Sequence, residues 1–264
     1  LARLHDVAPE RLLFAASSSE FIQRITAVSG RLLPGAVALP SPSYGDYRVA
    51  AQAWGRAVQT EAATLRWCAE PGSPDGRSEP PPARPDELLT VLDLAYAPLR
   101  LDGGSGWPAA ARDQVFQLFT PNKALGLCGV RGAYAIAPLR PPAGLLDALL
   151  AAEPSWPLGT QGQALLEAWC DATVREHLAN SLLRLRAWRA ELVDGLAQRG
   201  FRIAPGVTPF VMARLPERSD LQASDLRWQG VAVRDLTSFG LPACWRINSG
   251  PPEALIALWK ALDS

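Results

Sequence analysis

A lysine and an arginine flank a loop of small residues near the middle of the chain. Lys123 follows the apolar run 115–119, and Arg131 stands just before the apolar run 133–136. An isolated lysine is usually a solvated surface charge. Because the residues between these two cations are mostly small or apolar, we expect both to need anionic or covalent partners. A desolvated lysine becomes a usable amine nucleophile, so this stretch predicts covalent chemistry at Lys123.

An aspartate and a tyrosine stand at the end of another apolar run. Asp93 ends the run 90–93, and Tyr96 follows it within one short turn. An aspartate in this position can simply cap the turn. Beside Lys123 it has a second interpretation, because a buried carboxylate needs a cationic partner and a protonated pyridine nitrogen is one.

Three serines lie between the apolar run 12–15 and a predicted helix. Ser17, Ser18 and Ser19 precede Glu20, and N-capping alone explains a serine there. Three hydroxyl residues at a strand-to-helix turn also predict an anion site, since free backbone N–H groups and the helix dipole converge at that point. The glycine patterns of a Walker loop and of a dinucleotide-binding turn are both absent.

The elements that must position these residues form a regular alternation. Short apolar runs separated by helix-length intervals occur at 12–15, 36–39, 90–93, 115–118 and 133–136. This rhythm predicts an α/β fold with a three-layer, mostly parallel sheet covered on both faces. Ligands of such sheets bind at the carboxyl ends of the strands, where Asp93 and Lys123 are expected. The proline-rich segment 70–85 is predicted to be a loop.

The pattern changes in the last third of the chain. Leucines recur at helical spacing over 178–196 and Gly200 follows, which predicts one long amphipathic helix. Later elements are predicted at 210–213, at 231–233 and from Pro251 onward. We therefore expect a large domain over 1–160 and a smaller α+β domain over 161–264.

Composition excludes several functional classes. The 26 Lys and Arg residues balance the 26 Asp and Glu residues, whereas a protein that binds nucleic acid by neutralising phosphates is normally basic. No apolar stretch approaches the roughly 18 residues of a membrane span, so no membrane partner is expected. The four cysteines are scattered, which predicts reduced thiols, a cytoplasmic protein and no metal site.

Taken together, these stretches resemble a known family. Lys123 to Arg131 matches the run S-K-x-x-x-L-x-G-x-R, and Asp93 to Tyr96 matches D-E-A-Y. Both motifs are typical of the fold type I pyridoxal-phosphate enzymes, and specifically of class I and II aminotransferases near histidinol-phosphate aminotransferase and threonine-phosphate decarboxylase. The resemblance implies that Lys123 forms a Schiff base with pyridoxal phosphate and that Arg131 binds its phosphate. It also implies that Asp93 pairs with the ring nitrogen and that Tyr96 hydrogen-bonds the ring oxygen.

The resemblance extends to further residues. The serine turn looks like the family's G-S-D-E, in which Ser18 and Ser19 would hold the cofactor phosphate. The stretch 42–47 looks like P-T-Y-x-x-Y, which would place Tyr44 against the cofactor ring, although Tyr44 could also be an ordinary core aromatic. Arg234 and Arg246 are similar to the two arginine sites that bind the anionic group of the substrate.

Some positions depart from the family pattern. Ser73 stands where an asparagine contacts the ring oxygen, and Asn122 replaces a phosphate-binding serine, although Thr120 remains. Each change exchanges one hydrogen-bonding group for another, at a cost of about 0.5–1.5 kcal/mol in cofactor binding. Because the chain starts at Leu1, just before the serine turn, we also expect the family's N-terminal arm and the tyrosine it lends to the neighbouring subunit to be missing.

The resemblance therefore implies a cytoplasmic enzyme of amino-acid biosynthesis. It would be a homodimer that transfers an amino group between a small-molecule substrate, an amino acid or amino phosphate, and a 2-oxo acid. Two alternatives stay open. One is a decarboxylase of threonine phosphate that uses the same cofactor, and the other is a degenerate member of the family that has lost catalysis.

Overall fold

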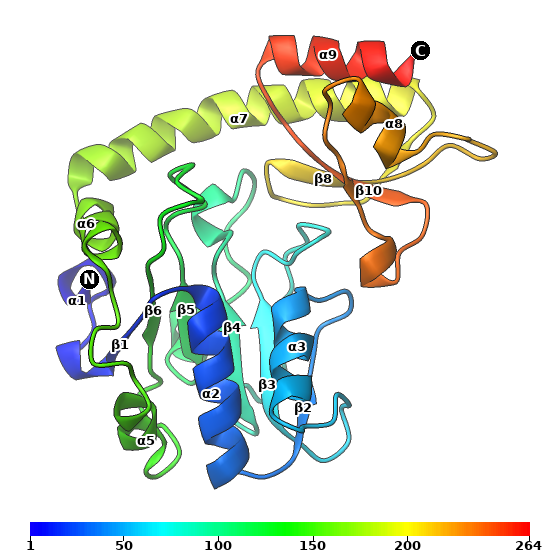
Figure 1. Ribbon diagram of the computed structural model, residues 1–264. Helices are drawn as coiled ribbons and strands as arrows, with labels where there is room; N and C mark the ends of the chain where they lie inside the picture. The colour runs from blue at the N-terminus through cyan, green and yellow to red at the C-terminus, as the bar shows by residue number, and fades with distance from the viewer. The chain divides into compact units, whose positions relative to one another are not determined.

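The chain divides into two structural units, which the computed structural model describes over residues 1–264 (Figure 1). The first unit comprises Leu1–Glu70, Glu79–Pro98 and Ser105–Leu178. The second comprises Pro71–Ser78, Leu99–Gly104 and Ala179–Ser264. The boundary between the units thus falls within the longest helix, and the short segments Pro71–Ser78 and Leu99–Gly104 also belong to the second unit. The division into a large domain over 1–160 and a smaller domain over 161–264 stays a prediction.

The first unit is built on a six-stranded sheet in the order β1-β6-β5-β4-β3-β2. The strands are β1 (Leu12–Ala15), β2 (Ala36–Ala38), β3 (Ala63–Ala69), β4 (Leu89–Asp93), β5 (Phe116–Phe119) and β6 (Ala133–Ile136). Strands β2 to β5 pair in parallel, whereas β6 runs antiparallel to both of its neighbours. The predicted α/β class with a mostly parallel sheet is confirmed. Its strands are apolar on both faces because helices and buried side chains cover both.

Helices α2 (Ser18–Leu32) and α3 (Gly45–Ala53) cover one face of this sheet (Figure 1). The side chain of Ser17 caps α2 by accepting the backbone N–H of Glu20 over 3.1 Å. Phe21, Ile22 and Ile25 then recur at helical spacing and are fully buried against the strands, together with α5 (Leu145–Ala151). The opposite face carries a smaller cluster of Leu92, Leu94, Trp107, Ala111 and Val115. The remaining helices of this unit are α1 (Ala2–His5), α4 (Ala109–Arg112) and α6 (Thr160–Trp169).

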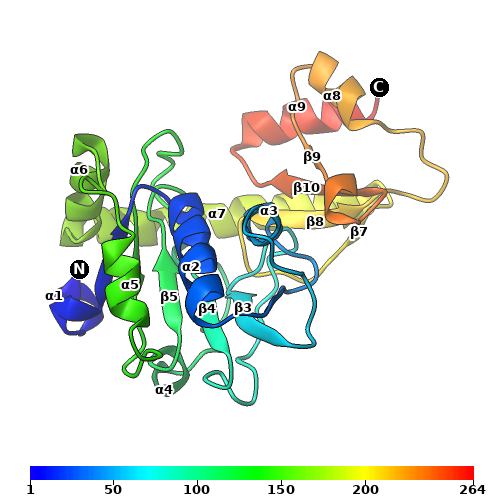
Figure 2. The same ribbon diagram turned by 60° about the horizontal axis from the view of Figure 1, so that its bottom comes forward.

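The second unit contains a four-stranded antiparallel sheet in the order β7-β8-β10-β9. Its strands are β7 (Arg202–Ile203), β8 (Phe210–Arg214), β9 (Arg234–Asp235) and β10 (Cys244–Asn248). Helices α8 (Ala223–Trp228), α9 (Pro252–Leu262) and the later part of α7 (Ala172–Gln198) share its core. Figure 2 shows the two longer helices beside this sheet from a second direction. The expected long helix and the proline-started closing helix are both present.

The element predicted at the apolar run 231–233 is not regular secondary structure, and the strand in this region is β9 at Arg234–Asp235. The backbone N–H of Val231 donates to Leu226 O over 2.9 Å, and Gly230 adopts φ +83°. This stretch therefore ends helix α8 and becomes a strand only afterwards. Separately, none of the helices is both long and apolar enough to span a membrane.

Candidate active site

Asp93 lies at the carboxyl end of β4, between two neighbouring strands of the first unit. It pairs in register with Ala69 on β3 and with Leu118 on β5. The residue is only 8% exposed, and both of its carboxylate oxygens accept hydrogen bonds. Tyr47 Oη donates to Oδ2 over 2.6 Å, and the backbone N–H of Ala95 donates to Oδ1 over 2.9 Å. Both donors are neutral, so the charge of this buried carboxylate calls for a cation in addition.

Lys123 lies in the turn that follows β5, the strand next to β4. The backbone N–H of Leu127 donates to Asn122 O over 2.8 Å, which closes the turn around the lysine. The Nζ atom lies over the ring of Tyr96, 5.2 Å from its centroid. The structure thus places close together two of the residues that the resemblance assigns to the cofactor site, Lys123 and Tyr96. Lys123 is half-buried, so the fully desolvated amine expected from the sequence is not what the structure shows.

The other predicted residues of this loop have different surroundings. Thr120 Oγ1 donates to Asn122 Oδ1 over 2.8 Å, and Asn122 Nδ2 donates to Val130 O over 3.1 Å. Both side chains are buried and brace the turn that carries Lys123. Arg131 precedes β6 and is exposed, which places its cation at the surface instead of in the apolar environment expected from the flanking residues.

The serine turn precedes α2 and meets the start of α3. Ser18 is buried, whereas Ser19 Oγ donates to Asp46 Oδ2 over 2.5 Å. Tyr44 Oη donates to the same carboxylate oxygen over 2.8 Å. Burial, and then the adjacent Asp46 carboxylate, raise the pKa of Tyr44 to about 12, so its hydroxyl remains a donor at neutral pH.

Three aromatic rings, those of Tyr44, Tyr47 and Trp67, contact one another in series. The ring of Tyr44 meets that of Tyr47 edge-on, with centroids 5.6 Å apart and an interplanar angle of 85°. Tyr47 is itself stacked on Trp67 of β3, with centroids 4.4 Å apart and an angle of 9°. Such contacts fix the planes of the rings, so one wall of this region is rigid and aromatic.

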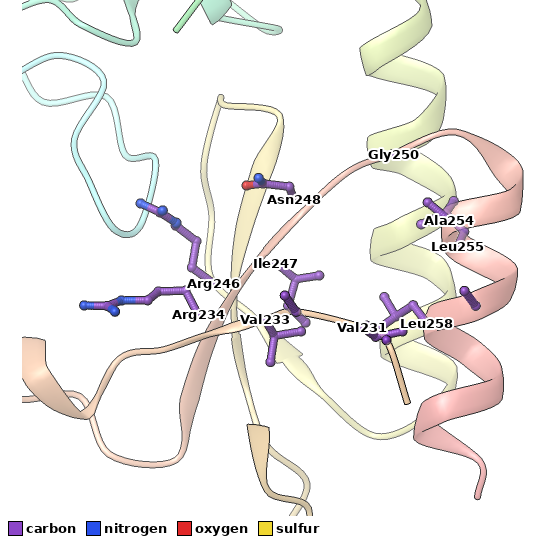
Figure 3. A pocket seen from close by; sticks show the side chains of 13 residues that line it. Val231, Val233, Arg234, Arg246, Ile247, Asn248, Gly250, Ala254, Leu255 and Leu258 are labelled. Atoms are coloured by element: carbon purple, nitrogen blue, oxygen red, sulfur yellow. The ribbon is translucent and has the colours of Figure 1, made fainter. Parts of the chain in front are cut away.

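Ser73, Arg234 and Arg246 belong to the second unit. Arg246 Nη1 donates to Ser73 Oγ over 3.2 Å, and its guanidinium lies 5.1 Å from the centroid of the Phe210 ring. Arg234 is the cross-strand partner of Arg246 in the β9–β10 pair. The two guanidinium groups extend to the same side of the strands, away from Leu255 and Leu258 (Figure 3). Both arginines line a cavity of about 430 Å³ between β10, α9 and the segment 230–234.

The loop that carries Ser73 is fixed within the second unit by backbone hydrogen bonds. Gly72 N–H donates to Arg77 O over 2.8 Å, and Val207 N–H donates to Gly76 O over 2.8 Å. Gly76 has φ +71°, and a Cβ added to it would lie 2.2 Å from Thr208 Oγ1. Only glycine suits this position, because the backbone is left-handed and a side chain has no room.

Comparison with known proteins decides the family. The profile described as "Aminotransferase class I and II" matches residues 83–262 of this chain. The chain belongs to the class I and II aminotransferases. The chain is also 37% identical over 177 residues to the histidinol-phosphate aminotransferase of Jannaschia sp. (strain CCS1), a match that covers 65% of this chain and 47% of that relative. It is 28% identical to the Ruegeria sp. (strain TM1040) enzyme of the same name, over 99% of this chain and 78% of the relative.

A solved structure shows the same fold. The histidinol-phosphate aminotransferase of Clostridium acetobutylicum superposes with a TM-score of 0.83 at 17% identity, covering 99% of this chain and 85% of that one. Pyridoxal phosphate is the cofactor of this aminotransferase, and the first unit fits it. Lys123 offers an amine for covalent attachment, and Asp93 offers a buried carboxylate whose two donors are neutral, as a protonated ring nitrogen requires.

Sequence reasoning gave no role to Tyr47, Trp67 or Asp46. Tyr47 is the second tyrosine of the stretch 42–47, and its spacing from Tyr44 could have placed both rings on one end of a helix. Trp67 lies on β3, a strand that was not predicted, although the alternation of apolar and polar residues there could have indicated it. Asp46 gives no signal in the sequence, since an acid in the first turn of a helix is ordinary.

Proposed function

We propose that this aminotransferase acts on an amine that carries an anionic group, such as histidinol phosphate, with a 2-oxo acid as the amino acceptor. The cross-strand pair of Arg234 and Arg246 is the observation that carries the choice of an anionic substrate. Like charges directly opposite each other in a sheet are unfavourable, so this pair gains most from a bound anion. The names of the Jannaschia and Ruegeria relatives support a phosphate monoester of histidinol.

Arg246 is proposed as the main contact to the substrate anion. Its present contacts are a serine hydroxyl and an aromatic ring, both neutral, so its charge can pair with a carboxylate or a phosphate. Ser73 orients it through the 3.2 Å hydrogen bond, and Arg234 supplies a second guanidinium on the same side of the sheet. Two such cations suit a dianionic group.

The residues of the first unit are proposed to handle the proton and the cofactor. When bound, pyridoxal phosphate supplies a carbon that takes up amino groups and a protonated ring that accepts electrons. Lys123 provides the amine for attachment, and it moves a proton at the amino-bearing carbon of the substrate. Asp93 holds the proton of the ring nitrogen by pairing with it. Tyr96 lies beneath the Lys123 ammonium group and is proposed to hydrogen-bond the ring oxygen.

The remaining predicted residues are proposed to bind the cofactor as well. Tyr44 would stand against its ring. The turn at Ser18 and Ser19 would hold its phosphate through backbone N–H groups, as helix N-termini do. Thr120, Asn122 and Arg131 are proposed to contribute to binding the phosphate, and Ser73 is proposed to hydrogen-bond the ring oxygen.

An assay of the products tests this proposal. The purified protein with pyridoxal phosphate is incubated with histidinol phosphate and 2-oxoglutarate, and glutamate is measured. We expect glutamate to form, and we expect Arg246→Gln to lower kcat/KM about a hundredfold, which corresponds to about 2.7 kcal/mol. Carbon dioxide released from O-phosphothreonine without glutamate would instead establish the decarboxylase. No reaction with either compound, despite bound cofactor, would overturn both proposed substrates, and the absence of a cofactor absorbance band would favour a non-catalytic member of the family.

The finer assignments also belong to this proposal. We infer a homodimer, a cytoplasmic location and a role in amino-acid biosynthesis, all supported by the family resemblance. Light scattering coupled to size-exclusion chromatography tests the homodimer. A mass of twice 28.4 kDa is expected, and a monomer that retains activity would contradict it.

A further inference from the structure

Tyr47 is a fully buried tyrosine whose hydroxyl reaches the carboxylate at the centre of the proposed cofactor site. It is 1% exposed and donates to Asp93 Oδ2 over 2.6 Å, a short distance that is typical of a hydroxyl bonded to an ionised oxygen. The two residues come from different elements, since Tyr47 lies on α3 and Asp93 ends β4. The bond therefore ties the helix layer to the edge of the sheet where the cofactor is proposed to bind.

The position of the Tyr47 hydroxyl is determined by its ring. Trp67 stacks on one face at 4.4 Å, and the edge contact with Tyr44 restrains the ring further. Trp67 lies on β3 two residues before Ala69, the residue paired with Asp93 on β4. The pairing of β3 with β4 therefore fixes the position of the Trp67 ring relative to the Asp93 carboxylate. Close packing of this buried ring therefore favours the orientation in which its hydroxyl is directed at Asp93.

The two hydrogen bonds to Asp93 act on its charge and its orientation. With Tyr47 on Oδ2 and the Ala95 N–H on Oδ1, the carboxylate plane is fixed from both sides. Both oxygens thus already accept a hydrogen bond, and the carboxylate can face the ring nitrogen only in this one orientation. A fixed acceptor at this position favours the protonated form of the cofactor nitrogen. Burial, and then the Asp93 carboxylate, hold the pKa of Tyr47 well above its usual value, so the phenol keeps its proton.

We propose that Tyr47 is a positioning residue that holds the Asp93 carboxylate in a fixed orientation toward the cofactor's ring nitrogen and thereby keeps that nitrogen protonated. This inference rests on the proposed function, because it assumes that Asp93 pairs with the ring nitrogen. It adds a residue that acts through Asp93 and does not itself contact the substrate.

The test replaces only the hydroxyl. Tyr47→Phe keeps the stacked ring, and Tyr134→Phe is the matched control, because that buried hydroxyl bonds to His5 instead. Each protein is loaded with pyridoxal phosphate labelled with ¹⁵N in its ring, and the ¹⁵N chemical shift is followed against pH. We expect the nitrogen of the Tyr47→Phe protein to lose its proton about one pH unit lower than in the wild type, a tenfold change in proton affinity. The control should follow the wild-type curve.

A second measurement detects the hydrogen bond between Tyr47 and Asp93 in the absence of the cofactor. In the cofactor-free protein we expect a slowly exchanging, low-field proton resonance from the Tyr47 hydroxyl, which is lost in Tyr47→Phe and shifted in Asp93→Asn. Superimposable nitrogen titrations of the wild type and Tyr47→Phe would overturn the positioning role while leaving the proposed function intact. A wild-type protein that takes up no cofactor would overturn the proposed function and this role together, whatever the hydroxyl resonance shows.

Discussion

Ser19 Oγ donates to Asp46 Oδ2 over 2.5 Å at the turn proposed to hold the cofactor phosphate. The same oxygen accepts a hydrogen bond from the Tyr44 hydroxyl, so the Asp46 carboxylate binds two hydroxyl donors near the start of α2. A dianionic phosphate binding at this turn would meet the negative charge of Asp46, which opposes it. We therefore expect the charge of Asp46 to weaken the binding of the cofactor phosphate at this turn.

Removing this charge should therefore tighten cofactor binding. We expect Asp46→Asn to lower the Kd for pyridoxal phosphate about tenfold, or about 1.4 kcal/mol, with a smaller gain at high salt. Calorimetric titration at two salt concentrations measures this. Asp147→Asn, which removes an exposed acid from the first turn of α5, is the control and should bind as the wild type does. Equal or weaker binding by Asp46→Asn would refute the charge argument.

Arg56 should contribute strongly to the stability of the first unit. Its Nε donates to Gly35 O, and its two other nitrogens donate to Thr26 O, Ser29 Oγ, Ala36 O and Thr64 Oγ1, at distances from 2.8 to 3.3 Å. All these acceptors are neutral and mostly buried. Arg56→Met leaves them without donors, and we expect the free energy of unfolding to fall by about 3 kcal/mol. Urea denaturation should show no comparable loss for Arg48→Met, since Arg48 is exposed on α3.

His5 should make the stability of the first unit depend on pH. Burial, helped by the positive charges of the N-terminal amine and Arg112, lowers the pKa of His5 from 6.5 to about 4. Above pH 6.5 the residue is neutral in both states and has no effect. Between pH 6.5 and 4 only the unfolded chain takes up the proton, so the free energy of unfolding falls as the pH falls.

Denaturation at a series of pH values measures this effect. His5→Phe keeps a ring beside Phe119, whose centroid lies 4.8 Å from that of His5, but it cannot take up a proton. We expect this variant to lose part of the decline seen in the wild type below pH 6.5. His177→Gln, an exposed histidine on α7, serves as the matched control. Parallel curves for the wild type and His5→Phe would contradict the assignment.

Gly76 should be required for the loop that carries Ser73. Gly76→Ala places a Cβ against Thr208 at a left-handed backbone position, and we expect a loss of about 2 kcal/mol in the free energy of unfolding of the second unit. Gly240→Ala is matched to it, because Gly240 has φ +73° but open space around its Cβ position. Thermal unfolding should show the larger loss for Gly76→Ala, and equal losses would mean that the contact with Thr208 relaxes without cost.

The local features of the fold could be predicted from the sequence. The apolar runs at 12–15 and 133–136 became β1 and β6 with the same bounds, because short fully buried strands carry their own signal. The helix cap at Ser17 could be predicted for the same reason, because it depends on residues only three positions apart. Strands β3 and β10 were missed because neither contains an uninterrupted apolar run, which was the signal for the predicted strands.

The motifs of the site were predictable, but its contacts were not. Asp93, Tyr96 and Lys123 could be selected because residue type and strand-end position indicate their chemistry. The bond between Tyr47 and Asp93 joins residues 46 positions apart, and it depends on how α3 packs on β3 and β4. The exposure of Arg131 and the bond between Ser73 and Arg246 likewise depend on tertiary packing, which no local pattern contains.

The central claim is that Lys123 binds the cofactor, and the sequence offers an unusually clear test because it contains two lysines, Lys123 and Lys260. The protein is loaded with pyridoxal phosphate and reduced with borohydride, and the labelled peptide is identified by mass spectrometry. We predict a label on Lys123 alone, preserved in Lys260→Ala and abolished in Lys123→Ala. A label on Lys260, or no label on a protein that shows bound cofactor, would contradict the account.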